Sequence, residues 1–242
     1  MKMDSIYKKE FHTLVEKLAQ DSEDYYIGVG NPNAKILIVG KEGVTEGIPE
    51  NEISLATRWL SKVKANESIE FNFRNLDEKG KQRPFREGDT YSKYQKLHDY
   101  IFEIENKDRD RYEVDFFRNF FLTEMNVNRA RNSKKASKSG MEKRKEEFFR
   151  NTEFIQQFPV VVLACGPYID NRKKKEVDTL FGVRFGEEYR SDLTEGQKFW
   201  THYNADKSKL VIHTRQLSSN VRNTLLEEMA KVIREFLESN NR

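Results

Sequence analysis

The stretch "NPNAKILIVGKEGVTEGIP" (residues 31–49) decides how this chain is expected to fold. Its apolar run, Ile36 to Val39, stops at Gly40, and a loop with a lysine, two glutamates and several turn-forming residues follows. A short run that is apolar on both faces is typical of a strand in a parallel sheet, since helices cover both sides of such a sheet. A glycine after the strand lets the backbone turn sharply and approach a ligand closely. The stretch therefore predicts a buried strand whose carboxyl end opens into a loop.

The same kind of apolar run recurs at residues 120–122, 160–164 and 210–212. Between the runs, apolar residues recur at spacings of three and four, which indicates amphipathic helices. These helices are expected near residues 6–18, 56–63, 91–104, 141–158 and 221–237, with Thr90 as the N-cap of the third. Strands that alternate with helices predict an α/β fold, and we expect a three-layer α/β/α sandwich around a central four-stranded parallel sheet.

The whole chain, residues 1–242, is expected to form one domain, because no break in composition divides it. Residues 64–90 are charged and rich in turn-forming residues, so we expect an insertion there that carries a small hairpin. Charged residues make up 34% of the chain but the net charge is only +3, so any affinity for nucleic acid must come from local clusters of basic residues.

The single cysteine, Cys165, excludes an internal disulfide and an all-cysteine metal site, and it fits a reducing cytoplasm. No apolar segment approaches the roughly 18 residues that cross a bilayer, so we expect a soluble, cytoplasmic protein without a membrane partner. Three histidines, His12, His98 and His202, lie far apart in the sequence without the spacing of metal ligands. We therefore expect neither a metal nor another cofactor.

Polar residues follow the other apolar runs at the points where each run ends. Glu124 and Asn126 follow the second run, Tyr168 follows the third, and His213 comes directly after the fourth. Ligands of open parallel sheets bind beyond the carboxyl ends of the strands, so these side chains are expected to share one rim with the loop after Gly40. Such a cluster of polar groups at one rim is what a catalytic cleft requires.

Four motifs in this order resemble the uracil-DNA glycosylase superfamily: "IGVGNPNAKILIVGKEG" (residues 27–43), "FFLTEMNVNRA" (120–130), "FPVVVLACG" (158–166) and "HTRQLS" (213–218). They are similar to that superfamily's first motif, its middle strand, its "P-VIVALG" strand and its closing "HPSPLS" motif. The resemblance spans most of the chain and implies a uracil-DNA glycosylase-like fold. It also implies hydrolysis of the N-glycosidic bond of a deaminated or damaged, uracil-type base in DNA.

The resemblance also implies roles for individual residues. Glu42 stands where one branch of the superfamily has a catalytic aspartate, which makes it the expected carboxylate near the sugar, and His213 is the expected donor near the base. Asn126 and Glu124 compete for the role of reading the base: an amide offers a donor and an acceptor, whereas a carboxylate only accepts. The expected substrate-binding residues are Gly40, Lys41, Gly43, Glu124, Asn126 and Tyr168.

A basic loop follows the second apolar run, and single- or double-stranded DNA is the expected partner of the chain. Such a loop binds phosphates without regard to sequence. Arg172 to Lys175 form a second basic run after the third strand. The expected nucleic-acid-binding residues are Arg129, Arg131, Lys134 and Lys135, next to Lys138 in the loop, and Arg215 and Ser218 near the C-terminal motif.

Less specific interpretations of the same residues stay open at this point. Glu42 is also compatible with a solvated loop carboxylate, His213 with a backbone hydrogen bond, and Asn126 with a turn cap. At the level of the whole protein, two alternatives remain. One is a catalytically inactive nucleic-acid-binding member of the same fold, and the other is an enzyme that handles nucleotides or nucleosides.

Overall fold

The computed structural model describes residues 5–22, 25–42, 55–77, 79–105, 110–128, 136–190, 196–218 and 220–240. Gly43, Arg129, Arg131, Lys134 and Lys135 lie outside these ranges. The described residues form a mixed α/β fold whose main sheet has the strand order β1-β5-β2-β6-β9-β8-β7. The strands of this sheet are β1 (Val29–Gly30), β2 (Ile36–Glu42), β5 (Phe120–Asn126), β6 (Val160–Leu163), β7 (Arg184–Arg190), β8 (Lys198–Tyr203) and β9 (Leu210–Thr214).

The four predicted strands lie next to one another at the centre of the sheet. β2 pairs in parallel with β5 on one side and with β6 on the other, and β6 pairs in parallel with β9. The register sets Ile38 beside both Leu122 and Val162. Every residue of β6 and β9 is buried, as expected for strands covered on both faces.

The prediction of a four-stranded sheet was wrong in extent, because antiparallel strands extend both edges. β1 pairs with β5, and β8 and β7 follow β9. In β8, buried and partly exposed residues largely alternate, and β7 carries two arginines and two glutamates among seven residues. An antiparallel strand with one solvated face lacks the continuous apolar run by which the central strands were predicted.

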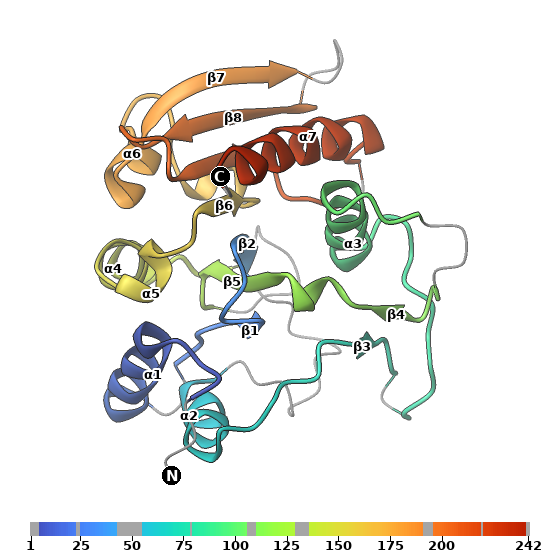
Figure 1. Ribbon diagram of the computed structural model, residues 1–242, viewed down its shortest axis with the longest axis vertical. Helices are drawn as coiled ribbons and strands as arrows, with labels where there is room; N and C mark the ends of the chain where they lie inside the picture. The colour runs from blue at the N-terminus through green and yellow to red at the C-terminus, as the bar shows by residue number, and fades with distance from the viewer. Residues whose placement is uncertain are drawn as a thin grey trace.

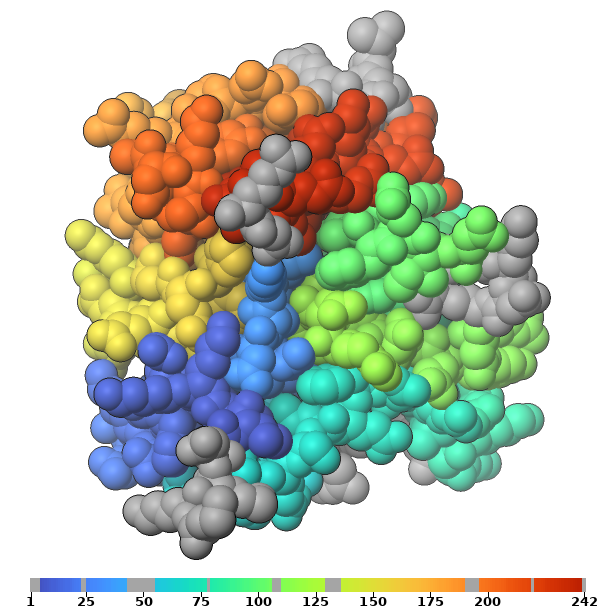
Figure 2. Space-filling model, in the orientation of Figure 1, coloured from blue at the N-terminus to red at the C-terminus, as the bar shows by residue number. Residues whose placement is uncertain are grey.

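Helices cover both faces of the main sheet. Leu37 and Val39 of β2 pack in one apolar cluster with α1 (Lys9–Asp21), α2 (Ala56–Ala65) and the helices between residues 141 and 181. Ile36 and Ile38 pack in the other cluster with α3 (Thr90–Ile101) and α7 (Asn223–Ser239). In Figure 1, α1, α4, α5 and α6 lie on one side of the central strands, and α3 and α7 lie on the other. Figure 2 shows the C-terminal strands and α7 at one end of the molecule and α1 and α2 at the opposite end.

Several predicted helix bounds need correction. The single helix expected over residues 141–158 is broken into α4 (Met141–Arg144), a π-helix, η2 (Lys145–Arg150), and α5 (Glu153–Gln156). Between η2 and α5, the Thr152 hydroxyl donates to the Phe148 carbonyl at 2.6 Å. A side-chain hydrogen bond of this kind competes with the backbone hydrogen bonds of a helix. Thr90 is the first residue of α3, and Asp89 holds the N-cap position.

Within the insertion at residues 64–90, Leu76 and Gln82 form an isolated antiparallel bridge. Its strand β3 (Phe73–Arg74) pairs with β4 (Glu113–Val114), which comes after α3 in the chain. Phe73 packs edge-on against Tyr91 of α3 at 5.5 Å between ring centroids. The insertion is thus attached to the α3 side of the sheet by long-range pairing and aromatic contacts.

Two connecting segments complete the fold: the 3-10 helices η1 (Phe116–Arg118), before β5, and η3 (Gly166–Tyr168), after β6. Helix α6 (Glu176–Phe181) leads into β7. Within the ranges given above, no helix combines the length and the apolar character needed to cross a membrane.

Candidate functional site

The carboxyl ends of three central strands, β2, β6 and β9, come together around Gly166. Its backbone carbonyl accepts a hydrogen bond from His213 Nε2 at 2.9 Å. A β-carbon at this position would lie 3.7 Å from Lys41 Cε and 3.8 Å from Arg215 Cα, so the ends of β2 and β9 both border it. The structure thus brings the end of β2 and the residues that follow β6 and β9 to one rim at the carboxyl ends of the strands.

Glu42, the last residue of β2, is held in place by a neighbouring aromatic residue. The hydroxyl of Tyr168 donates a hydrogen bond to Glu42 Oε2, although the two residues are 126 positions apart. The Tyr168 ring is buried, and the ammonium groups of Lys41 and Lys138 lie 5.7 and 5.1 Å from its centroid. The Glu42 carboxylate is therefore oriented at the rim with two cations near the ring that binds it.

Glu124 lies beside β2 rather than in the loop beyond it. Its register partner is Gly40, and a β-carbon at Gly40 would come closer than 3.0 Å to the Glu124 carboxyl group. The missing side chain of Gly40 thus provides the space for this carboxylate. On α3, burial and then the charge of Glu124 raise the pKa of Tyr94 well above its ordinary value. The Glu124 charge therefore reaches α3, and it also acts on Arg144 of α4.

Asn126 is fully buried, and its amide is bound to the loop that follows β5. Its Nδ2 donates to the Ser137 carbonyl at 2.8 Å, and its Oδ1 accepts from the backbone N–H of Asn128 at 3.1 Å. Asn128 Nδ2 donates to the Ser139 carbonyl at 2.8 Å. Asn126 therefore organises this loop in the manner of a turn cap, and its role in reading a base stays a prediction.

A buried arginine that the sequence analysis did not single out fixes the end of β5. Arg144 donates to the carbonyls of Glu124 and Tyr26 at 2.9 and 3.0 Å and to the Thr123 hydroxyl at 3.0 Å. Its guanidinium lies 4.1 Å from the Phe148 ring centroid. The only sequence signal for it is a charged residue on the apolar face of an expected helix.

His213, at the end of β9, is 5% exposed and stacks on Trp200 of β8, with ring centroids 5.3 Å apart. Burial lowers the pKa of His213 to about 4, so its imidazole is neutral at pH 7. The carbonyl of Gly166 can only accept, so Nε2 carries the proton, and Nδ1 is buried without a hydrogen-bond partner among the described residues. A role as donor to a base would require Nε2 to exchange its bond to Gly166.

The depressed pKa of His213 predicts that acid destabilises the fold. The histidine of the unfolded chain takes up a proton near pH 6.5 and the folded one only near pH 4, so falling pH within this window favours unfolding. This group should remove up to about 3 kcal/mol of the free energy of unfolding between pH 7 and pH 4. Urea denaturation across this range should give a flatter pH profile for His213→Asn than for wild type. An unchanged slope in His213→Asn would contradict the prediction.

The rim opens into a pocket of about 520 Å³ beside His213. Arg172, Lys173, Lys198 and Arg215 line it together with one acid, Asp170. The Asp170 carboxylate accepts backbone N–H groups of the loop that follows it, at 2.7 to 3.1 Å, and these bonds lower its pKa. The pocket is therefore basic, which suits an anionic ligand.

Among the residues that the sequence analysis selected, Arg215 lines this pocket. Ser218 forms a backbone turn toward α7, since its carbonyl accepts from Val221 N–H at 3.0 Å. Lys198 and Trp200 were not among the predicted site residues, because both lie on β8, a strand that was not predicted. The signal that could have found them is the composition of "KFWTHY", which is rich in the aromatic and β-branched residues typical of strands.

No group of three or more histidine, cysteine or acidic side chains in the described ranges is arranged to hold a metal ion. Comparison of the chain with protein-family models gave no match, and comparison with curated proteins gave none either. The assignment of a function therefore depends on the motifs of the sequence and on the geometry of the rim.

Proposed function

We propose that this protein hydrolyses the N-glycosidic bond between the sugar and a deaminated or damaged base in DNA, at the rim formed by the end of β2 and the residues that follow β6 and β9. The observation that carries the proposal is the Glu42 carboxylate, oriented by Tyr168 at the end of β2 and one residue from Lys41, which borders Gly166. The central run of parallel strands supports the uracil-DNA glycosylase-like fold that the motifs imply. The buried free thiol of Cys165 fits the cytoplasmic setting that belongs to the same proposal.

The reaction explains why a fixed carboxylate matters. As the bond breaks, positive charge develops on the sugar and negative charge on the departing base. A carboxylate that is already oriented stabilises the sugar cation without reorganisation, and this kind of preorganised group is among the strongest sources of rate enhancement. The target base must first leave the stack and enter a pocket. The basic lining beside His213 is suited to the phosphates that flank such an extruded nucleotide.

One observation favours a second candidate, a nucleic-acid-binding protein that releases no base. The Nε2–H of His213 is committed to the Gly166 carbonyl and the imidazole is neutral, so the expected donor to the base is occupied. In that case the rim and its cations would bind DNA, and Glu42 would serve only to hold Tyr168. The two candidates differ in product formation and not in binding.

The test uses oligonucleotides that carry one uracil, hypoxanthine or xanthine, in single strands and in duplexes. Base release leaves a site that alkali cleaves, so strand scission on a gel measures the reaction. We expect scission with at least one of the three bases and none with the undamaged oligonucleotide. Binding without scission for all three would reject hydrolysis and favour the second candidate. Release from free nucleosides but from no oligonucleotide would instead indicate a nucleoside-handling enzyme.

A further inference from the structure

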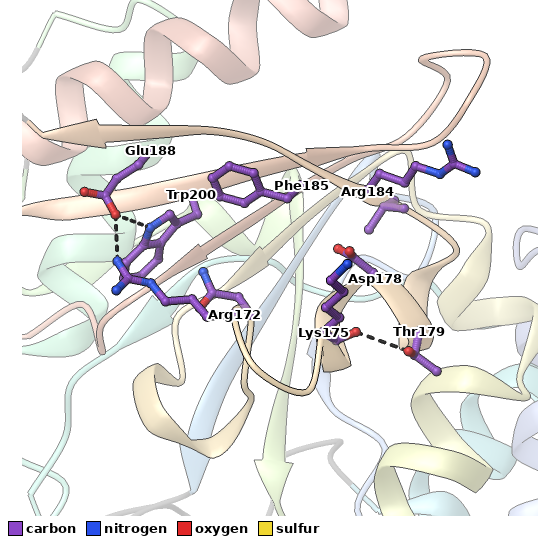
Figure 3. Close-up of a pocket in the computed structure, with 10 residues that line it drawn as sticks. Arg172, Lys175, Asp178, Thr179, Arg184, Phe185, Glu188 and Trp200 are labelled. Atoms are coloured by element: carbon purple, nitrogen blue, oxygen red, sulfur yellow. Dashed lines mark hydrogen bonds and ion pairs between the residues drawn. The ribbon is translucent and has the colours of Figure 1, made fainter.

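A second, larger pocket adjoins the one beside His213. It has a volume of about 1010 Å³ and lies between helix α6 and the β7–β8 pair. The two pockets share three lining residues, Asn171, Arg172 and Trp200, so they adjoin each other at these residues. Figure 3 shows the larger pocket, with Trp200 and Arg172 at one end and Arg184, Lys175 and Thr179 at the other. We call the joined pockets the β7–β8 groove.

Trp200 is fixed at the junction of the groove. Its indole Nε1 donates to Glu188 Oε2 at 2.6 Å, and Arg172 donates to the same oxygen at 2.8 Å. The Arg172 guanidinium lies 5.3 Å from the Trp200 ring centroid, and the His213 ring stacks on Trp200. A rigid aromatic residue thus links the catalytic rim to the outer part of the groove.

The acids of the groove all accept hydrogen bonds, whereas most of its cations form no ion pair with the residues that the structure describes. Asp170 accepts three backbone N–H groups, and Asp178 is paired with His202 at 2.8 Å. The third acid, Glu188, is bound by Arg172 and Trp200. Among the described residues, none of the remaining basic side chains of the groove forms an ion pair: Lys173, Lys175, Arg184, Lys198 and Arg215. The groove therefore presents free positive charge along its length.

An exposed aromatic ring lies at the outer part of the groove. Phe185 of β7 is 51% exposed, and it packs edge-on against the buried His202 with ring centroids 5.6 Å apart. In Figure 3 its ring lies between Trp200 and Arg184. Grooves that combine cations with exposed aromatic rings are typical of single-strand binding, in which phosphates contact the cations and unpaired bases stack on the rings.

We propose that the β7–β8 groove binds a single-stranded segment of nucleic acid that leads away from the rim, with phosphates on Lys175 and Arg184 and a base stacked on Phe185. This inference deepens the proposed function, on which it rests for the identity of the ligand. It predicts that the protein prefers single strands, or strands already separated near the target base, to intact duplex.

The test measures the affinity for an undamaged single-stranded 15-mer by fluorescence anisotropy at several salt concentrations. For Lys175→Gln/Arg184→Gln we expect binding at least about tenfold weaker at 0.1 M salt, and a salt slope smaller by about 1.4, since each phosphate contact to a single strand contributes about 0.7. Phe185→Ser should weaken binding by at least about fivefold through lost stacking. The matched controls, Lys9→Gln/Lys17→Gln on α1 and Phe102→Ser after α3, change exposed residues away from the groove and should bind like wild type.

Equal binding by the groove variants and their controls would overturn the inference, as would equal affinity for a mononucleotide and for the 15-mer. Because the 15-mer carries no damaged base, this result does not depend on base release. Weakened binding in the groove variants together with no base release from any substrate would keep the groove and reject the hydrolysis. If the groove variants still release the base and bind the strand as tightly as wild type, the hydrolysis would be kept and the groove rejected.

Discussion

The Glu42→Gln protein is expected to release the target base about 100- to 1000-fold more slowly than wild type, the effect of losing one preorganised electrostatic group. Glutamine has nearly the same shape as glutamate and keeps an oxygen that accepts the Tyr168 hydroxyl, so the local packing should survive. What disappears is the negative charge that, in the proposed reaction, stabilises the developing sugar cation. Single-turnover rates of strand scission, with enzyme in excess over the oligonucleotide, would measure this change.

Two further variants separate the charge of Glu42 from its orientation. Tyr168→Phe keeps the buried ring but removes the hydroxyl that orients Glu42, and we expect a smaller loss, about tenfold, from the misplaced carboxylate. Glu228→Gln removes the same charge from an exposed position on α7 and should leave the rate unchanged. Wild-type rates in Glu42→Gln would remove Glu42 from the mechanism, whatever the other variants do.

The Gly28→Ala protein is expected to be much less stable than wild type. Gly28 lies beside the short strand β1. Its backbone has φ +142°, a value that residues other than glycine rarely adopt. A β-carbon there would also approach the Leu122 carbonyl oxygen more closely than 3.0 Å. The Gly28 carbonyl also accepts the indole N–H of the fully buried Trp59 at 2.7 Å. Backbone strain and overpacking each cost about 1 to 3 kcal/mol, so Gly28→Ala should lower the free energy of unfolding by about 3 to 5 kcal/mol.

Gly80 is the matched control for this prediction. It also has a positive φ, +73°, but a β-carbon there would meet no atom within 4 Å. Gly80→Ala should therefore lose only about 1 to 2 kcal/mol, from the backbone conformation alone. Urea denaturation midpoints at a constant m-value would compare the two proteins. Equal losses would show that the contact with Leu122 does not limit the space at Gly28.

The central strands could be predicted from the sequence because their signal is local. Each is a short run that is apolar on both faces, and the runs that contain Ile38, Leu122, Val162 and Ile212 proved to be neighbours in one sheet. The residues after these runs were expected at one rim because the carboxyl ends of parallel strands share an edge. The contacts of Gly166 with the ends of β2 and β9 agree with that expectation.

The antiparallel strands β7 and β8 and the groove beside them could not be predicted in the same way. In β7 and β8, charged and aromatic residues are mixed because one face of each strand is solvated, and this pattern is shared with ordinary surface segments. Trp200 therefore gave no sign that it stacks on His213 and binds Glu188. The basic run at residues 172–175 was noticed, but its position in a hollow depends on the β7–β8 pair.

The amino-acid sequence by itself determined where the chain is buried on two faces, hence the class of fold and the order of its central strands along the chain. Only the tertiary structure decided the partners of the polar side chains: Tyr168 for Glu42, Gly166 for His213, and the loop after β5 for Asn126. The physical reason is that burial leaves a periodic pattern within a few residues. The partner of a hydrogen-bonding side chain is chosen instead by the crossovers that bring distant segments together, and no local pattern records that choice.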